Sequence, residues 1–293
     1  MDSFSIAELQ QFSGIKAHTI RIWEQRYDAL RPDRSEGNTR RYDGQQLRRL
    51  LNIVSLMNSD HKVSELCTMS DKKLYELLGS QSFQTKQADL SYEYFISQII
   101  AAALEYNEAL FDKMFSSAVL RFGIRESYRK IVYQVLRRLG LMWSTDTLRP
   151  AHEHFITSLI RQKILTAIDS LPLSTSKDTW LLFLPPGEFH ETGLLFANFL
   201  LRQSGQRVIY LGADVPFESL KAAAGEISPT CLLLFLVRKN NQEDDEELIS
   251  HLSRQFKDQR IYVACDSTRL LETRKTKRVW VLHSVEDLEA VMK

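Results

Sequence analysis

Five short apolar runs alternate with helix-length amphipathic stretches in the C-terminal part of the chain, and they constrain its fold more than any other feature. The runs span residues 180–184, 207–211, 231–237, 260–264 and 278–282. Buried runs of this length, separated by helical segments, are typical of a parallel sheet with helices on both faces. The sequence therefore predicts a doubly wound, flavodoxin-like α/β domain, in which ligands bind beyond the carboxyl ends of the strands.

The middle of the chain has a different pattern, because apolar residues recur there at every third or fourth position. Ile96, Ile99 and Ile100 show this spacing, which places them on one face of an α-helix. Gly123 and the segment 144–150 supply breaks between successive helices. We therefore expect a bundle of about four helices.

Two polar segments separate these regions and set the expected domain boundaries. They span residues 79–89 and 172–178 and are rich in turn-forming residues. A chain of 293 residues also exceeds the size of roughly 250 residues at which single cores stop growing. We predict three domains, at residues 1–78, 90–171 and 178–293.

The first predicted domain has the pattern of an all-α winged helix-turn-helix. Ser5 and Glu8 form a capping-box pair at the start of a short helix. A turn at Gly14 leads to a second helix over residues 17–27, whose exposed face would enter the major groove of DNA. Residues 31–42 then form a basic hairpin beside that helix, and we expect this hairpin to act as the wing.

The clustering of arginines, rather than the total charge, is the electrostatic signal for DNA binding. The formal net charge of +1 excludes a uniformly basic nucleic-acid coat. Guanidinium groups gathered on one face bind phosphates by releasing counterions, while a helix contacts base edges. The alternative is a solvated basic face on a protein-binding helical domain. The cluster comprises Arg31, Arg34, Arg40, Arg41, Arg48 and Arg49, with the expected hairpin turn at 36–38.

Cysteine usage and the amino terminus indicate a cytoplasmic protein. Cys67, Cys231 and Cys265 lie far apart, so neither a zinc site nor a disulfide framework is predicted. The first residues lack the pattern of a secretion signal, and the longest aliphatic run, 231–237, is too short to span a bilayer. We expect no membrane partner.

The loop after the first strand of the predicted α/β domain contains a candidate metal ligand. Glu188, His190 and Gly193 have the spacing Glu-x-His-x-x-Gly there. Imidazole is a common ligand of transition metals, a nearby carboxylate can fix its tautomer, and glycine allows close approach of a bulky ligand. The alternative is a polar pair on the surface that binds nothing.

A second candidate cluster lies around the end of the predicted bundle. Trp143 is followed ten positions later by Glu153 and His154, and Pro150 opens the helix that carries the last two. An aromatic ring, an acid and an imidazole can wall one face of a planar ligand held over the α/β domain. The alternative is a core tryptophan beside a solvated Glu-His pair.

The N-terminal residues closely resemble the DNA-binding domain of the MerR family of transcriptional regulators, whose members bind promoter DNA as dimers at inverted repeats. The resemblance covers about 70 residues. It rests on Thr19-Ile-Arg-Ile-Trp-Glu-Gln-Arg-Tyr27, Leu30-Arg-Pro32, Asn38-Thr-Arg-Arg-Tyr42 and Leu47. The DNA contacts that it implies are Thr19, Arg21, Arg26 and Tyr27 from the helix, and Arg40, Arg41 and Tyr42 from the wing.

Together, the bundle cluster and the loop Pro185-Pro-Gly-Glu-Phe-His-Glu-Thr-Gly193 resemble the cobalamin-binding photoreceptor regulators of the CarH and LitR type, in domain order as well as in motif. The resemblance implies adenosylcobalamin as cofactor, with His190 as the lower axial ligand of cobalt and Trp143 over the upper face. Glu153 and His154 would stand where light-induced loss of the adenosyl group lets an imidazole bind cobalt. It also implies a homo-oligomer, a tetramer that represses its operator in darkness and dissociates in light.

The chain departs from this resemblance on two of the expected strands. Such domains carry a small Ser-x-Leu element in the third strand and a Gly-Gly pair after the fourth, and both make room for a buried nucleotide tail. Here those strands contain Leu232-Leu-Leu-Phe-Leu-Val237 and Val263-Ala264-Cys265-Asp266. Large side chains in such a channel would cost about 1–3 kcal/mol each, which weakens or abolishes binding.

Three hypotheses about function follow. The first is a regulator whose occupancy of DNA is set by adenosylcobalamin and by light. The second is a MerR-type regulator that has lost the cofactor and responds to a protein partner or acts constitutively. The third is a cobalamin-dependent enzyme module of the methyltransferase type, but no arrangement of nucleophile, base and oxyanion donors is present. We therefore expect that the chain is not an enzyme.

Overall fold

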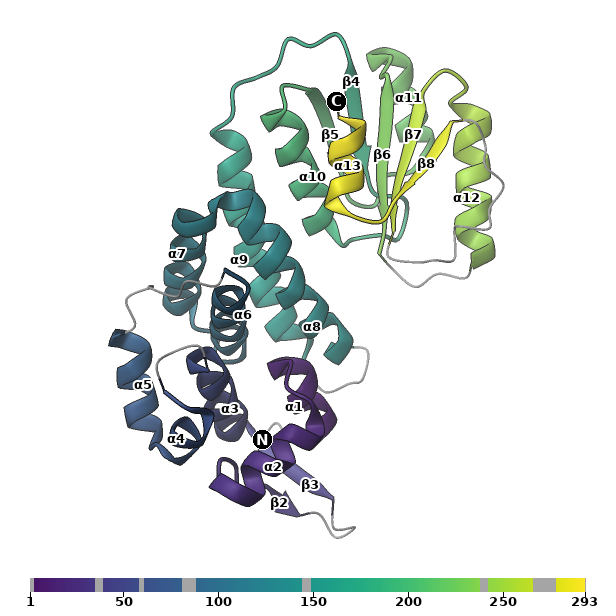
Figure 1. The fold of residues 1–293 in the computed structure, drawn as a ribbon. Helices are drawn as coiled ribbons and strands as arrows, with labels where there is room; N and C mark the ends of the chain where they lie inside the picture. The colour runs from purple at the N-terminus through teal and green to yellow at the C-terminus, as the bar shows by residue number, and fades with distance from the viewer. Residues whose placement is uncertain are drawn as a thin grey trace. The chain divides into compact units, whose positions relative to one another are not determined.

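The computed structural model describes residues 3–34, 39–57, 61–80, 88–143, 149–237, 242–265 and 278–292. The chain divides into two compact units, Met1–Leu159 and Ile160–Lys293, and the boundary falls within helix α9 (Pro150–Asp169). Figure 1 shows the elements of both units. The separation of the first unit into two domains stays a prediction.

The N-terminal helices are those that the sequence predicts. Helix α1 (Ile6–Ser13) begins at the capping box of Ser5 and Glu8, and helix α2 (Ala17–Tyr27) has the predicted bounds. Gly14 ends α1 with a φ of 73°, which glycine adopts without the steric cost of a side chain. The predicted helix-turn-helix is confirmed.

A small antiparallel sheet beside these helices forms the predicted wing. Strand β3 (Arg40–Asp43) pairs on one side with β2 (Asp33–Arg34) and on the other with β1 (Ser3–Phe4), which the sequence analysis did not predict. The predicted hairpin turn at 36–38 lies outside the described residues. Pairing with β1 fixes the base of the wing, because the ring of Phe4 packs edge-on against that of Phe12 in α1.

Three helices complete this part of the unit: α3 (Gly44–Leu56), α4 (Val63–Thr68) and α5 (Asp71–Ser80). Arg49 of α3 holds them together. Its guanidinium donates to the carbonyl oxygens of Ala29 (2.7 Å), Cys67 (2.7 Å) and Met69 (2.8 Å) and pairs with Asp71. Only 16% of the Arg49 side chain is exposed, so this cation serves the fold and is withdrawn from the surface.

The helical middle region packs directly on the helix-turn-helix. The buried side chain of Gln98 donates to Ser55 of α3 (3.0 Å). Arg138 makes a two-pronged pair with Glu93 (2.7 and 2.8 Å) and also donates to the carbonyl oxygen of Phe12 (3.0 Å), two residues before Gly14. The region comprises α6 (Ala88–Leu104), α7 (Glu108–Ser127), the π-helix η1 (Tyr128–Val132), α8 (Tyr133–Trp143) and α9.

Gly123 breaks α7 as the sequence predicts. Its φ of 75° and ψ of 161° are not helical, so the chain bends there before it continues into η1 and α8. The predicted bundle is therefore confirmed as a set of helices. The predicted linker over 79–89 coincides partly with the ends of α5 and α6, and residues 81–87 of it lie outside the described residues.

The second unit contains the predicted doubly wound sheet. Its five parallel strands lie in the order β5-β4-β6-β7-β8. The chain adds β5 on one side of β4 and then adds β6, β7 and β8 on the other side, so the strand order reverses at β4. The strands are β4 (Thr179–Phe183), β5 (Arg207–Gly212), β6 (Cys231–Leu236), β7 (Arg260–Cys265) and β8 (Val279–Leu282). The helices are α10 (Glu191–Gln203), α11 (Phe217–Ile227), α12 (Gln242–Gln255) and α13 (Val285–Val291).

Helices cover both faces of this sheet, as Figure 1 shows. On one face, Leu181, Leu232 and Leu234 pack with Leu220 of α11 and Leu252 of α12 in an apolar core. We call the other face, which α10 covers, the α10 face. Successive side chains of a strand point to opposite faces of the sheet, so every second residue of each strand lies on the α10 face. Residues that are in register on neighbouring parallel strands lie on the same face.

Stacked aromatic rings line the α10 face. The ring of Trp180 (β4) stacks on that of Tyr262 (β7) at 5.0 Å, and Tyr262 stacks on Trp280 (β8) at 5.3 Å. Strand β6 lies between β4 and β7, and its residue in register with Trp180 is the small Cys231, which leaves room for the first stack. The α10 face is therefore filled by the protein's own rings over three strands.

We expect Arg49→Ala to lower the free energy of unfolding by about 1–3 kcal/mol, because it leaves buried carbonyl oxygens without a donor. Urea unfolding of the full chain, followed by helical circular dichroism, measures this change. Arg31→Ala is the matched control, since 81% of the Arg31 side chain is exposed and it pairs only across a surface turn with Asp28. Equal effects of the two substitutions would contradict the structural role of Arg49.

Candidate functional site

Helix α2 presents its polar side chains on the outer surface of the helix-turn-helix. Arg21 and Arg26 are exposed, while Thr19 and Tyr27 are half-buried. Ile20 and Trp23 face inward and are buried. The four helix residues predicted to contact DNA are therefore all at least partly accessible, as a recognition helix requires.

Glu24 of α2 ties the recognition helix to the wing. Its Oε1 accepts from Nε of Arg40 (2.9 Å), and its Oε2 accepts from the hydroxyl of Tyr42 (2.9 Å). The sequence analysis missed this residue, because an acid within an exposed amphipathic helix gives no sign of a partner in a distant strand. The Glu24 contacts fix the wing at a set position beside α2.

The wing residues predicted to contact DNA fall into two kinds. Arg41 is exposed, whereas Arg40 keeps only 26% of its side chain exposed and is engaged by Glu24. Tyr42 is completely buried, and its burial together with the hydrogen bond to Glu24 raises its pKa well above the usual range. The side chain of Tyr42 thus supports the wing from inside in this structure, and contact with DNA by Tyr42 stays a prediction.

Not every arginine of the predicted cluster faces solvent. Arg48 pairs with Glu105, directly after α6 (3.0 Å), and Arg49 is held by the carbonyl oxygens described above. Arg31 is exposed beside Asp28, and Arg34 and Arg41 lie on the wing strands. The exposed members of the predicted cluster, Arg31, Arg34 and Arg41, therefore lie on the wing or directly before it, and α2 adds Arg21 and Arg26. Positive charge gathered on neighbouring elements is what a groove-binding surface needs.

Glu188 and His190 form the centre of the candidate ligand site, beyond the carboxyl end of β4. Nδ1 of His190 lies 2.5 Å from Oε1 of Glu188, and the His190 backbone N–H donates to the same oxygen (3.0 Å). Glu188 is 4% exposed, whereas 44% of the His190 side chain is exposed. A buried carboxylate on Nδ1 orients the imidazole and leaves Nε2 as the nitrogen for a metal.

The backbone around this pair is fixed by neighbouring strands. The other oxygen of Glu188 accepts from the N–H of Val237, directly after β6 (3.1 Å). The N–H of Gly187 donates to the Asp214 side chain (2.8 Å), and the N–H of Asp214 donates back to the Glu188 carbonyl (3.2 Å). The loop is therefore preorganised by three strands, a requirement for a site that holds a metal in a set geometry.

Glu191 is a half-buried acid near this loop that the sequence analysis did not single out. It accepts from the hydroxyl of Tyr210 (2.9 Å) and from Arg161 (2.6 Å). Burial and the Glu191 charge raise the pKa of Tyr210 well above its usual range, so this hydroxyl stays a donor. The contacts anchor the N-terminal end of α10, on which His190 is the N-cap residue.

Gly193 lies one turn along α10 and packs directly on β6. A Cβ at residue 193 would lie 2.8 and 3.0 Å from the Cε1 and Cδ1 atoms of Phe235, closer than real contacts allow. The glycine is therefore required by the structure as it stands, but the surface next to it is occupied by the Phe235 ring. The Glu188–His190 pair fits axial ligation of a metal, whereas the space beside Gly193 does not fit a bulky buried group.

The bundle cluster belongs to the other unit. His154 is exposed, with Nδ1 3.7 Å from Oε2 of Glu153, so the predicted Glu-His pair lies on the surface. Trp143 is the last residue of α8, and its side chain lies outside the described residues. The sequence analysis missed His152, which is 5% exposed and stacks on Tyr106 with 4.5 Å between ring centroids.

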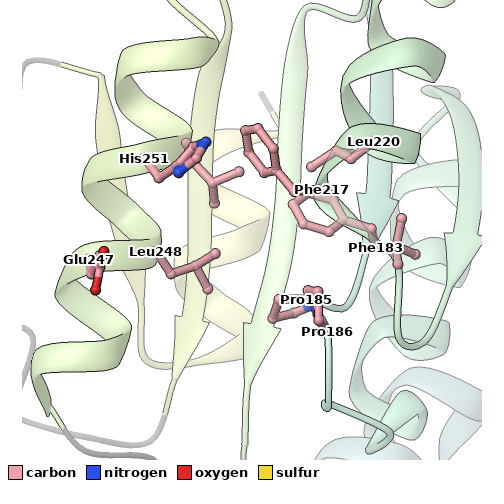
Figure 2. A pocket seen from close by; sticks show the side chains of 10 residues that line it. Phe183, Pro185, Pro186, Phe217, Leu220, Glu247, Leu248 and His251 are labelled. Atoms are coloured by element: carbon pink, nitrogen blue, oxygen red, sulfur yellow. The ribbon is translucent and has the colours of Figure 1, made fainter.

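A cavity of about 300 Å³ opens at the carboxyl end of β4 on the face covered by α11 and α12. Figure 2 shows Phe217 and His251 side by side on its wall, with the Pro185-Pro186 turn below them. Their rings meet edge to face at 3.9 Å between centroids. The cavity lies across the sheet from Phe235.

The described residues contain no cluster of metal ligands. Among them, no group of three or more His, Cys, Asp or Glu side chains could hold a metal ion. Burial raises the pKa of both Cys67 and Cys231 to about 11, so neither thiol is ionised at neutral pH.

No helix in the described ranges is long and apolar enough to cross a membrane.

Comparison with known families agrees with the N-terminal architecture. Residues 4–72 match the family described as MerR HTH family regulatory protein. The N-terminal domain is therefore a MerR-type helix-turn-helix, and the class of protein is a DNA-binding regulator.

The similarity to individual regulators extends well beyond that domain. The chain is 29% identical over 241 residues to the HTH-type transcriptional repressor CarA of Myxococcus xanthus, covering 82% of this chain and 78% of the repressor. It is 25% identical over 244 residues to the repressor CarH of the same organism, covering 83% and 81%. Its homologues are thus transcriptional repressors.

A solved structure has the fold of the helical region and the sheet. The monomethylamine corrinoid protein of Methanosarcina barkeri matches with a TM-score of 0.50 at 13% identity, covering 68% of this chain and 97% of that protein. At this identity the likeness concerns the fold alone. It confirms the predicted order of helical region and doubly wound α/β domain.

We expect Arg21→Ala to reduce the slope of log binding constant against log salt concentration by about one, because it removes one phosphate neutralisation. Titration of promoter DNA at several salt concentrations measures the slope. Arg48→Ala is the matched control: its guanidinium pairs with Glu105, so the slope should not change. An unchanged slope for Arg21→Ala removes this residue from the interface.

Proposed function

We propose that the chain is a DNA-binding transcriptional regulator whose occupancy of promoter DNA is controlled by adenosylcobalamin at its C-terminal α/β domain. The observation that carries the proposal is the buried Glu188 carboxylate on Nδ1 of His190, in a chain that begins with a MerR-type helix-turn-helix. Similarity to the CarA and CarH repressors over more than three quarters of the chain supports the regulatory role.

On the DNA side, helix α2 enters the major groove and the wing contacts the sugar-phosphate backbone. Arg21, Arg26 and Arg41 are exposed and supply the positive charge, while Thr19 and Tyr27 lie at the edge of the helix face. Arg40 and Tyr42 act mainly by fixing the wing through Glu24. A homo-oligomer would present two such surfaces to an inverted repeat, as the MerR resemblance implies.

On the cofactor side, His190 would bind cobalt through Nε2, and Glu188 would hold the imidazole in the required tautomer. A single protein ligand suits a metal whose other positions are filled by a macrocycle. The resemblance to CarH-type regulators implies that Trp143, Glu153 and His154 bind the same cofactor. When bound, the cofactor supplies a cobalt–carbon bond that light can break, and Glu188 and His190 would orient it.

The contact of α8 with the helix-turn-helix offers a route from the bundle to DNA. Arg138 donates to the carbonyl oxygen of Phe12 while Glu93 holds its guanidinium. A shift of α8 would therefore act on the turn between α1 and α2, at Gly14. The two hydrogen bonds from Arg138 to Glu93 give the contact between α8 and Phe12 a defined geometry. A switch between two arrangements of α8 needs such a defined contact.

A second candidate function is a MerR-type regulator that no longer binds cobalamin and responds to a protein partner. The packing of Phe235 on Gly193 favours it, because that ring occupies space beside the candidate ligand. A methyltransferase-type enzyme module is less favoured, since the homologues are repressors and the chain carries a DNA-binding domain.

The DNA-binding half of the proposal is tested by retardation of promoter fragments from the gene's own neighbourhood at low ionic strength. We expect the full chain to retard a fragment that contains an inverted repeat, and to do so more weakly after Arg21→Ala. A chain that retards no such fragment is not a regulator of this class.

The cofactor half is tested with the full chain and adenosylcobalamin in darkness. We expect Glu188→Gln to weaken binding by about 10–100-fold, because loss of the carboxylate frees the imidazole to rotate. His190→Ala should remove the change in visible absorbance that accompanies binding of an imidazole to cobalt. Glu218→Gln, an exposed acid on α11, is the matched control. Equal binding by the wild-type chain and His190→Ala would exclude His190 as the ligand.

A further inference from the structure

One aromatic ring lies against α10 three residues after His190. Phe235 of β6 lies on the α10 face, and its Cε1 and Cδ1 atoms are 2.8 and 3.0 Å from the position that a Cβ at residue 193 would take. Val237, two residues further, is tied by its N–H to Glu188. The same buried acid that orients His190 therefore also fixes the strand end that carries Phe235.

Binding of cobalt by His190 raises the question of where the cofactor's own base lies, because that base then needs space near His190. Cobalt in a corrin has one lower axial position, and in complete cobalamin the molecule's own dimethylbenzimidazole base can occupy it. An imidazole from the protein displaces that base. The base is a planar aromatic group on a tether, so after displacement it stays within reach of that tether, beside the part of the domain that carries His190.

The described residues on both faces of the sheet limit where such a base can lie. On the α10 face, the rings of Trp180, Tyr262 and Trp280 stack across the sheet toward the amino-terminal ends of the strands, and Trp180 and Tyr262 are 2% and 3% exposed. The cavity beside Phe217 lies on the opposite face of the sheet. A base placed on the α10 face beside Gly193 would have to push Phe235 aside.

We propose that Phe235 makes this domain select corrinoids that lack the lower nucleotide, of the cobinamide type, over complete cobalamins. The inference rests on the proposed function, because it takes His190 as the cobalt ligand. It deepens that function by naming the class of corrinoid. Cobinamide keeps the corrin ring and the cobalt but has no base to displace, so His190 binds it without any movement of Phe235.

The experiment compares adenosylcobinamide and adenosylcobalamin as ligands of the full chain in darkness. The visible absorbance change that accompanies imidazole ligation gives a dissociation constant for each. We expect the wild-type chain to bind adenosylcobinamide at least tenfold more tightly. Because cobinamide has no competing base, this preference alone does not implicate Phe235, and variants supply the decisive comparison.

Phe235→Ser opens the space beside Gly193 and should tighten adenosylcobalamin binding at least tenfold while leaving adenosylcobinamide binding nearly unchanged. Phe217→Ser is the matched control, since it removes the same side chain from the opposite face of the sheet, and it should leave the ratio of the two constants at the wild-type value. His190→Ala should abolish the absorbance change with both corrinoids. Circular dichroism of each variant checks that the α/β domain is folded.

The possible failures are distinguishable. If folded Phe235→Ser leaves the ratio of the two dissociation constants at the wild-type value, the selection by Phe235 is wrong and the proposed function stands, whether or not the wild-type chain prefers adenosylcobinamide. If neither the wild-type chain nor folded Phe235→Ser binds either corrinoid, the proposed cofactor control is wrong, and the inference is overturned with it.

Discussion

The buried carboxylate of Glu188 is the interaction on which the C-terminal site depends. One oxygen orients His190, and the other accepts from the backbone at the end of β6. A buried carboxylate without partners would cost several kcal/mol, so these hydrogen bonds are what allow it to lie there. Because the same side chain bridges the loop and the neighbouring strand, the position of the imidazole is set by the sheet rather than by a mobile loop.

Glu24 has a corresponding role at the other end of the chain. It joins α2 to β3 by accepting from Arg40 and Tyr42, so two hydrogen bonds fix the wing beside the helix. Each candidate site is thus organised by one acid that reaches across two elements. The Arg138 contact with Phe12 joins the helical region to the same DNA-binding body.

Local patterns were sufficient to predict most of the fold. The capping box at Ser5, the bounds of α2 and the five strands of the sheet all follow from residues that are close in sequence, and the structure has them. The Glu188–His190 pair is also local, and its spacing predicted its geometry. Contacts between distant segments were not predictable in this way. In the sequence, Glu24 resembles any surface acid, but in the structure it binds the wing. Arg49 resembles a DNA-binding cation, but its guanidinium binds backbone carbonyl oxygens. The motif singles out His154, which is exposed, whereas His152, two positions earlier, is buried.

The large residues on β6 illustrate the difference between composition and contact. The sequence showed that the third strand is bulky, but only the packing shows that Phe235 is the residue against Gly193 and that Leu232 and Leu234 belong to the opposite core. Sheet register and the closeness of α10 therefore decide which side chain of β6 lies beside the candidate loop. This is the kind of information that a single sequence does not contain.

The most direct test of the account measures promoter occupancy by the full chain in darkness, with and without a saturating corrinoid, for the wild type and for His190→Ala. The account predicts that the corrinoid changes the apparent affinity of the wild type for DNA at least fivefold and leaves that of His190→Ala unchanged, as coupling between two sites requires. Identical DNA affinity of the wild-type chain with and without a corrinoid that is demonstrably bound would contradict it.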